Sequence, residues 1–187
     1  MRYDAVVIGG GRSGCAEALR RASDGQKVCL VAAGLTLHSL EPELKGKPYA
    51  ELHALTKAGI AVLRGDTVEK VQWSACEAIA SGRRVESLRT ANGITLEAAE
   101  FVLATGRFFS RGLVADMEGV REPLFGADVD FPADRSKWFN PDFFAPQPFE
   151  SFGVKTDKAG RILKGGKPVE NVYAVGKILG GKHDAGR

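Results

Sequence analysis

The first 34 residues of the chain consist mainly of two short apolar runs separated by one amphipathic stretch. The run YDAVVI is apolar and rich in β-branched residues, which is typical of a strand buried on both faces of a parallel sheet. After GGGRSG comes CAEALRRASDG, in which Ala16, Leu19 and Ala22 recur on one face of a helix. A second apolar run, KVCLVAAG, follows. This order predicts a β-α-β unit with a glycine-rich turn between its first strand and its helix.

The glycines of that turn have the spacing of a dinucleotide-binding fingerprint. Gly9, Gly11 and Gly14 match the pattern G-x-G-x-x-G. In this pattern the first glycine makes a tight turn, the second admits a pyrophosphate, and the third lets the helix and strand pack closely. The alternative is a glycine-rich turn without a ligand, but the strands on both sides favour phosphate binding at the positive end of the helix dipole.

One element of the fingerprint is missing at the end of the second strand. A dinucleotide site usually has Asp or Glu there, about 20 residues after the glycines, to bind the adenosine ribose hydroxyls. This sequence has Ala32 and Ala33 instead, followed by Gly34. Because alanine cannot accept a hydrogen bond through its side chain, three alternatives remain: the backbone and Gly34 bind the ribose, the ribose is bound elsewhere, or the ligand has no adenosine half.

The middle of the chain predicts a connection, a helix and a small antiparallel unit. Residues 35–49 are irregular and contain two prolines, so we expect a surface connection there. PYAELHALTKAGIAVLRGD then predicts a helix followed by a strand at 60–63. Between residues 67 and 100, short apolar or alternating runs surround Asn92-Gly93, a strong hairpin signal, and predict a β-meander. The run 101–103 returns to the parallel sheet.

That last run ends in Ala104-Thr105-Gly106, and small residues at a strand end let a ligand approach the backbone. The alternative is simply a tight turn. The following region is rich in Phe, Pro and Gly without clear periodicity, so we expect an ordered loop in which Phe143, Phe144 and Phe149 form a small core of their own.

Two further elements are expected near the C-terminus. Residues 152–156 and 161–163 bracket a short turn and predict a hairpin. Residues 171–175 predict a final strand that ends at Gly176. We therefore expect one α/β domain over residues 1–187: a Rossmann-like FAD/NAD(P)-binding fold with a mainly parallel central sheet and an inserted antiparallel β-meander.

Composition limits the kinds of function that the chain can have. The 187 residues are 44% hydrophobic and 26% charged, and the net charge of +3 includes no long run of like charges, so nothing indicates a nucleic-acid partner. Cys15, Cys29 and Cys76 are far apart, without a C-x-x-C pair, so no metal site or disulfide framework is expected and a cytoplasmic location fits. No apolar run approaches the roughly 20 residues that span a bilayer. Any membrane association is expected to occur through a partner.

Four stretches, taken in order, resemble a known family: GGGRSG, LATGRFFSRGLVADMEGVREPLFGADV, DFFAPQPFESFGVKTD and NVYAVGKILGGKHD. They are similar to the B subunit of anaerobic glycerol-3-phosphate dehydrogenase, a flavoprotein family. The most specific parts are FFSRGLVA, REPLFG and DFFAPQPF. Relative to the family, only a short segment at 35–66 occupies the place of a larger cap segment, so the resemblance implies a shortened form.

The resemblance implies a flavin cofactor, usually FMN, with FAD as the other possibility. It also implies two partners, a catalytic A subunit that contains FAD and a membrane-anchoring iron–sulfur C subunit. Together they oxidise glycerol 3-phosphate to dihydroxyacetone phosphate and pass electrons toward quinone. Ala32 agrees with FMN, which has a phosphate but no adenosine ribose. By the same resemblance, residues 175–181 form the closing side of the flavin site, and the helix that covers it would follow the end of this sequence.

The glycine spacing and the resemblance together give fourteen candidate cofactor-binding positions. They are Gly9, Gly10, Gly11, Arg12, Ser13, Gly14, Ala32, Ala33, Gly34, Ala104, Thr105, Gly106, Gly176 and Lys177. Lys177 stands where many related flavoproteins have Asp, and it could donate to the flavin phosphate or to the pyrimidine carbonyls, or be an ordinary surface lysine. The catalytic residues are unknown; Arg121 and His183 are weak candidates, and Arg121 could equally form a salt bridge with Glu122 or Glu118.

Three functions are consistent with the sequence. The first is a flavin-binding electron-transfer subunit of the glycerol-3-phosphate dehydrogenase complex. The second is a degenerate assembly module of the same family that no longer binds flavin, in agreement with Ala32, Lys177 and the short length. The third, a stand-alone NAD(P)-dependent reductase, is disfavoured because residues 85–150 resemble the flavoprotein.

Overall fold

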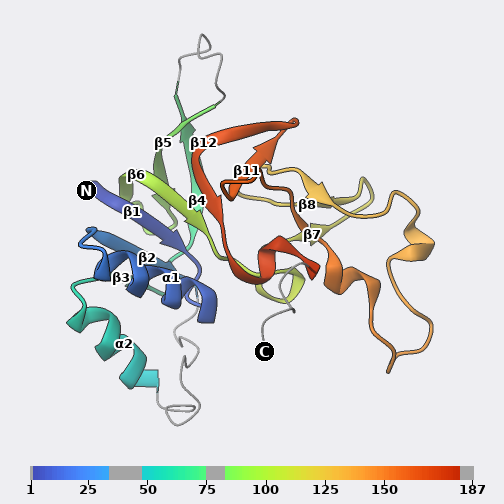
Figure 1. Cartoon of the computed structure of the whole chain (residues 1–187), viewed down its shortest axis with the longest axis horizontal. Helices are drawn as coiled ribbons and strands as arrows, with labels where there is room; N and C mark the ends of the chain where they lie inside the picture. Colours follow the sequence, from blue (N-terminus) through green and yellow to red (C-terminus); the bar gives the residue numbers. More distant parts are fainter. Residues whose placement is uncertain (1, 34–47, 75–82, 182–187) are drawn as a thin grey trace.

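Eight strands form one mixed sheet in the computed structural model, which describes residues 2–33, 48–74 and 83–181 (Figure 1). The strands are β1 Arg2–Ile8, β2 Val28–Ala32, β3 Ala61–Arg64, β4 Val68–Trp73, β5 Val85–Thr90, β6 Thr95–Leu103, β11 Arg161–Lys164 and β12 Lys167–Ala174. Their order is β11-β12-β6-β1-β2-β3, and β5 joins β4 to β6. The five strands β12, β6, β1, β2 and β3 are parallel, which confirms the predicted fold class.

The central strand β1 separates two hydrophobic layers, because successive side chains of a strand point to opposite faces. Val7 packs on the side of the helices α1 (Arg12–Ser23) and α2 (Pro48–Lys57), where Cys15, Ala18 and Leu55 are buried. Val6 packs on the other side, into a larger layer formed with the C-terminal half of the chain. The apolar run of β1 is therefore continuous because both of its faces are buried.

The buried face of α1 differs from the expected one at one position. Cys15 and Ala18 are fully buried, Leu19 and Ala22 pack at the edge of the same layer, and Ala16 is exposed. The predicted face is therefore confirmed at Leu19 and Ala22 and wrong at Ala16. Cys15, which is small and apolar enough for the interior, is the residue that completes the correct face.

The strand β6 pairs antiparallel with one neighbour and parallel with another. Its first residues pair antiparallel with β5, as Ser87 lies opposite Glu97, and its last residues pair parallel with β1, as Val6 lies opposite Phe101. With β4 antiparallel to β5, the predicted meander is present. The run 101–103, which was expected to return to the parallel sheet, does so as the last part of the nine-residue strand β6.

The remaining strands are short. They are β7 Val114–Ala115, β8 Val120–Arg121, β9 Val129–Asp130 and β10 Gly153–Val154. The hairpin predicted from residues 152–156 and 161–163 is present next to its turn, where Thr156 pairs antiparallel with Ile162 and the Leu163 amide donates to the Lys155 carbonyl at 2.9 Å. The start of its first arm, β10, pairs with β9 instead. The principal hairpin is β11 with β12, around Gly165 and Gly166, which both have positive φ.

Aromatic rings organise the irregular region between β6 and β10. Phe152 is buried, and its ring lies 6.1 Å from Trp138 and 6.3 Å from both Phe108 and Phe131. Phe149 contacts Phe108 edge-on. Phe143 and Phe144, which we expected to form a core with Phe149, are instead exposed to solvent. Within the described ranges no helix is long and apolar enough to cross a membrane.

Candidate functional site

The carboxyl ends of the parallel strands define a switch point in the order of the sheet. From β1 the chain passes to β2 and then β3 on one side, and it later returns to β6 and β12 on the other side. The connections that leave β1 and β6 therefore diverge, and in open α/β sheets a crevice for ligands forms at that place. The residues that follow β1 and β6 are those of the glycine-rich turn and of Ala104-Thr105-Gly106.

The glycine-rich turn is compact on two sides and open on the third. Gly9 has a φ of +119°, and a Cβ atom there would overlap the carbonyl oxygen of Ala104. A Cβ atom at Gly14 would overlap the carbonyl oxygen of Gly9. At Gly11, in contrast, no atom lies within 4 Å of the Cβ position. Two of the glycines thus allow close packing of β1, β6 and α1, and Gly11 leaves space beside the backbone for a ligand.

The helix α1 begins at this open position. Its first helical hydrogen bond runs from the Cys15 amide to the Gly11 carbonyl at 2.9 Å, so the amides of Arg12, Ser13 and Gly14 precede the ladder. The N-cap residue Gly11 makes no side-chain cap, and the first turn has no acidic residue. This end of the helix has donors and a positive dipole end without a negative side chain, which is the arrangement that binds an anion.

The end of β6 supplies a polar atom beside the turn. The Oγ1 atom of Thr105 is buried and has no hydrogen-bond partner within the described residues. Unpaired buried hydroxyl groups are costly, and in native proteins they commonly mark a place for water, an ion or a ligand. Gly106 and Gly112 pack against each other closely enough that a Cβ atom on Gly112 would overlap the Gly106 carbonyl oxygen. The position of Thr105 is therefore fixed by backbone packing.

The turn after β12 lies against the residues that follow β1 and β6. A Cβ atom on Gly176, which has a φ of +76°, would overlap the Ser13 side chain, so the turn after β12 lies directly against the start of α1. The 3₁₀ helix η5 (Gly176–Leu179) continues from this point. The Arg107 Nε atom donates to the Lys177 carbonyl oxygen at 2.8 Å and joins the loop after β6 to the turn after β12. Arg107 is not among the predicted positions, because the sequence gives no signal for a side chain that reaches 70 residues along the chain.

Three of the predicted positions lie at the end of β2. Ala32 is buried, and its carbonyl oxygen accepts from the Gly65 amide at 2.9 Å, whereas Ala33 is exposed. Gly34 lies outside the described residues. No carboxylate takes the place of the usual Asp or Glu at Ala32 or Ala33, so neither side chain can bind a ribose.

Positive charge gathers around this edge of the sheet. Arg12 and Lys177 are exposed and Arg107 is half-buried, and none of the three forms an ion pair in the part of the chain that the structure describes. Cations without carboxylate partners, beside open amide donors, give the edge a potential suited to phosphate groups.

The two weak catalytic candidates are not brought to this edge by the described structure. The Arg121 Nε atom donates to the Asp116 Oδ2 atom at 2.8 Å within the β7–β8 ribbon. Its ion-pair partner is therefore Asp116, and neither Glu118 nor Glu122. Glu122 is buried and accepts backbone amides instead. His183 lies outside the described residues.

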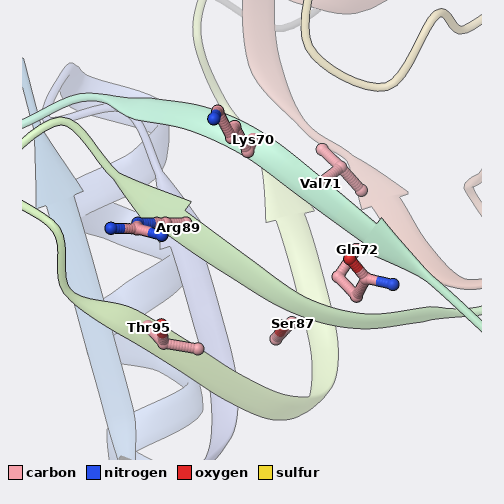
Figure 2. Close-up of a pocket in the computed structure, with 6 residues that line it drawn as sticks. All are labelled: Lys70, Val71, Gln72, Ser87, Arg89 and Thr95. Atoms are coloured by element: carbon pink, nitrogen blue, oxygen red, sulfur yellow. The ribbon is translucent and has the colours of Figure 1, made fainter.

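A hollow on the outer face of β4, β5 and β6 is a different place (Figure 2). It is lined by Lys70, Val71, Gln72, Ser87, Arg89 and Thr95. Thr95 begins β6 and Leu103 ends it, so the hollow and the switch point are separated by roughly 25 Å at about 3.3 Å per residue. It is an exposed strand face and not part of the candidate site. Among the described residues, no cluster of His, Cys, Asp or Glu is placed to hold a metal ion.

Comparison with known proteins identifies a family whose model matches this chain. Residues 47–187 match the family model described as FAD binding domain. The crystal structure of THI4 from Thermovibrio ammonificans is similar with a TM-score of 0.45 and 18% identity, over 56% of this chain and 58% of that one.

Curated relatives agree with the resemblance that the sequence motifs indicated, and they confirm it. The B subunit of the anaerobic glycerol-3-phosphate dehydrogenase of Yersinia enterocolitica is 38% identical over 149 residues, which are 78% of this chain and 34% of that protein. The corresponding B subunit of Actinobacillus pleuropneumoniae is 36% identical over 162 residues, 80% of this chain and 36% of that protein. The chain thus spans about a third of the length of these relatives.

Proposed function

Because the chain belongs to the family of FAD binding domains, we propose that it binds a flavin at the carboxyl ends of β1, β6 and β12. The observation that carries this proposal is the turn after β1, where Gly9 and Gly14 pack without space for a side chain and Gly11 faces open space. A turn that only joined a strand to a helix would not require this difference between its glycines. A phosphate of the cofactor would occupy the space beside Gly11 and accept from the amides of α1.

We propose FAD as the flavin. The description of the matched family supports FAD, and it gives no support to the FMN that the resemblance implied. A pyrophosphate suits the open glycine and the nearby cations Arg12 and Arg107. The adenosine ribose would have to contact backbone groups near Ala33, because the end of β2 has no carboxylate side chain.

The role of the protein follows from the residues around the proposed cofactor. A bound flavin supplies the redox chemistry, and the chain supplies binding, orientation and electrostatics. Arg107 would hold the turn after β12 in place through the Lys177 carbonyl. Positive charge at Arg12, Arg107 and Lys177 would favour an anionic cofactor and its reduced anionic form.

The activity of the whole protein is proposed from its relatives. Their name supports a role in the oxidation of glycerol 3-phosphate, as the B component of a dehydrogenase complex. In this role the chain would relay electrons toward quinone beside a catalytic A subunit and a membrane-anchoring C subunit, in the cytoplasm and in contact with the membrane only through its partners.

A second candidate is an assembly module of the same family that has lost its cofactor. The absence of an acidic side chain at Ala32 and Ala33 favours it, because dinucleotide sites usually bind the ribose through that position. The two candidates predict opposite results for the purified protein.

The test is the absorbance spectrum of the purified chain, followed by heat release of the chromophore and chromatography against FAD and FMN. The proposal predicts a yellow protein that releases FAD in a ratio near one to one. Release of FMN would support the flavin site but show that its cofactor is FMN and not FAD. A colourless protein that binds neither flavin at micromolar concentration would favour the assembly module.

A further inference from the structure

Two adjacent phenylalanines are almost fully exposed at the tip of one loop. The exposed fractions of Phe143 and Phe144 are 84% and 94%, and their rings contact each other edge-on with centroids 5.6 Å apart. We call residues 139–147 the aromatic loop. It projects away from the sheet, as the orange segment of Figure 1 shows. Single exposed apolar side chains are common, but a contacting pair of rings at the tip of a loop indicates an interaction site.

The aromatic loop is held in shape by side-chain hydrogen bonds. The Gln147 Nε2 atom donates to the carbonyl oxygens of Asp142 at 3.0 Å and Ala145 at 3.1 Å, and its Oε1 atom accepts from the Asn140 amide at 2.9 Å. The Asp142 Oδ1 atom accepts from the Phe144 amide at 3.0 Å. A loop ordered in this way loses less conformational entropy when it binds than a flexible loop does.

The base of the aromatic loop is fixed to the interior. The Phe149 amide donates to the Trp138 carbonyl oxygen at 3.0 Å, and both rings belong to the aromatic cluster around Phe152. The tip therefore has a defined position relative to the sheet. Three prolines in the sequence NPDFFAPQPF restrict the backbone further.

The charge around the tip distinguishes between kinds of partner. Residues 139–149, FNPDFFAPQPF, contain one carboxylate, Asp142, and no Lys or Arg, and the nearest charged residues on either side are Lys137 and Glu150. Loops that insert into membrane surfaces combine apolar residues with Lys and Arg, because cytoplasmic membrane surfaces are negatively charged. A tip with two aromatic rings beside the Asp142 carboxylate fits a protein surface that has an apolar pocket bordered by Lys or Arg.

We propose that the aromatic loop is a docking element and that its partner is a protein with an apolar pocket whose border is positively charged. The inference rests on the proposed function, in which the chain is part of a multi-subunit complex, and it assigns the contact with the catalytic A subunit to Phe143 and Phe144. Aromatic residues that enter a pocket are the side chains on which protein interfaces most depend. The Asp142 carboxylate, which lies beside the Phe144 amide, faces the cations at its border.

The test measures binding of the 187-residue chain to the purified A subunit of the same organism, using isothermal titration calorimetry. The double variant Phe143→Ser/Phe144→Ser should bind at least tenfold more weakly. The matched control is Met117→Ser, which removes an apolar side chain that is 89% exposed outside the loop and should bind as the unmodified chain does. Asp142→Asn, which keeps an oxygen to accept from the Phe144 amide, should weaken binding severalfold, and the loss should shrink as salt is added.

The flavin content of every variant is measured in parallel, because these exposed side chains are remote from the glycine-rich turn. A chain that retains flavin but binds no A subunit overturns the docking inference and leaves the proposed function intact. An unmodified chain that contains no flavin overturns the proposed function itself. Equal binding of the double variant and the control, dimerisation that the double variant abolishes, or association with phosphatidylglycerol vesicles that depends on the two rings would each overturn the inference.

Discussion

The ligand-facing edge of the sheet and the aromatic region between residues 107 and 152 are built by opposite means. At the edge, backbone atoms and small residues decide the geometry, since Gly9, Gly14 and Gly176 are each so close to a neighbour that no Cβ atom fits. In the aromatic region, side chains decide it: short strands and 3₁₀ turns are joined by ring contacts around Phe152.

The difference teaches why the two regions should respond differently to mutation. Added volume at the edge should act first on ligand binding and on the approach of α1 to β1. Removed volume in the aromatic region should act on folding, because the rings form much of the core of that segment. Experiments that measure ligand binding and stability separately therefore test whether the two regions differ in this way.

The largest effect is expected from Phe152→Ala. The Phe152 side chain is 2% exposed and contacts three other aromatic rings, so its removal should lower the free energy of unfolding by about 3–5 kcal/mol. Chemical denaturation measures the change, with Phe143→Ala as the exposed control that should alter it by no more than about 0.5 kcal/mol. Amide hydrogen exchange should show lost protection in residues 107–152 and retained protection in β1. Equal loss of protection in β1 would mean that the two regions unfold as one unit.

An intermediate effect is expected at Glu122. This side chain is 2% exposed, and its carboxylate accepts from the amides of Leu124 at 2.9 Å and Phe125 at 2.7 Å. Glu122→Gln replaces one acceptor oxygen by a donor that faces an amide, and it should cost about 1–3 kcal/mol.

The same carboxylate gives a pH dependence. Burial raises the pKa of Glu122 although the amide donors oppose the shift. A raised pKa means that the stabilising contribution is fully present below the ordinary pKa of about 4.3 and is lost as pH rises through the folded-state pKa. The difference in unfolding free energy between the unmodified chain and Glu122→Gln should therefore shrink from about pH 4 upward. A difference that grows with pH would show that the amide donors outweigh burial.

The smallest effect is expected from Arg107→Leu at the edge. It removes the hydrogen bond from Arg107 Nε to the Lys177 carbonyl oxygen, which should cost about 1 kcal/mol and weaken flavin binding about fivefold. Arg107→Lys keeps the charge without this bond and separates the two roles in a fluorescence titration with FAD. If the lysine variant binds as tightly as the unmodified chain, Arg107 acts by its charge and does not position the turn.

The sequence predicted the edge better than the aromatic region, for physical reasons. The strand β1, the glycine-rich turn and α1 follow one another directly, so local hydrophobic periodicity and glycine spacing are sufficient to place them. The meander was equally accessible because Asn92-Gly93 marks its turn. On α1 only Ala16 was misassigned, because Cys15 and Ala18 complete the buried face with Leu19 and Ala22.

Contacts between distant segments were not accessible from the sequence. Nothing in the pattern indicates that β10 pairs with β9, or that Arg107 reaches Lys177. The composition of residues 139–149 showed that aromatic side chains would matter there, but it did not show which of them are buried. Phe149 packs against the core, while Phe143 and Phe144 are exposed, because the hydrogen bonds of Gln147 direct the loop outward.

The central claim is that the space beside Gly11 holds the phosphates of FAD, and Gly11→Val tests it most directly. Apart from its chain neighbours, no described atom lies within 4 Å of the Cβ position there, so the fold should be retained. Ala16→Val, an exposed position on the same helix, is the matched control. Isothermal titration with FAD should show binding to the unmodified chain and to Ala16→Val, and at least a hundredfold loss in Gly11→Val at unchanged thermal stability. Equal FAD affinity in Gly11→Val and Ala16→Val would contradict the account and place the flavin elsewhere.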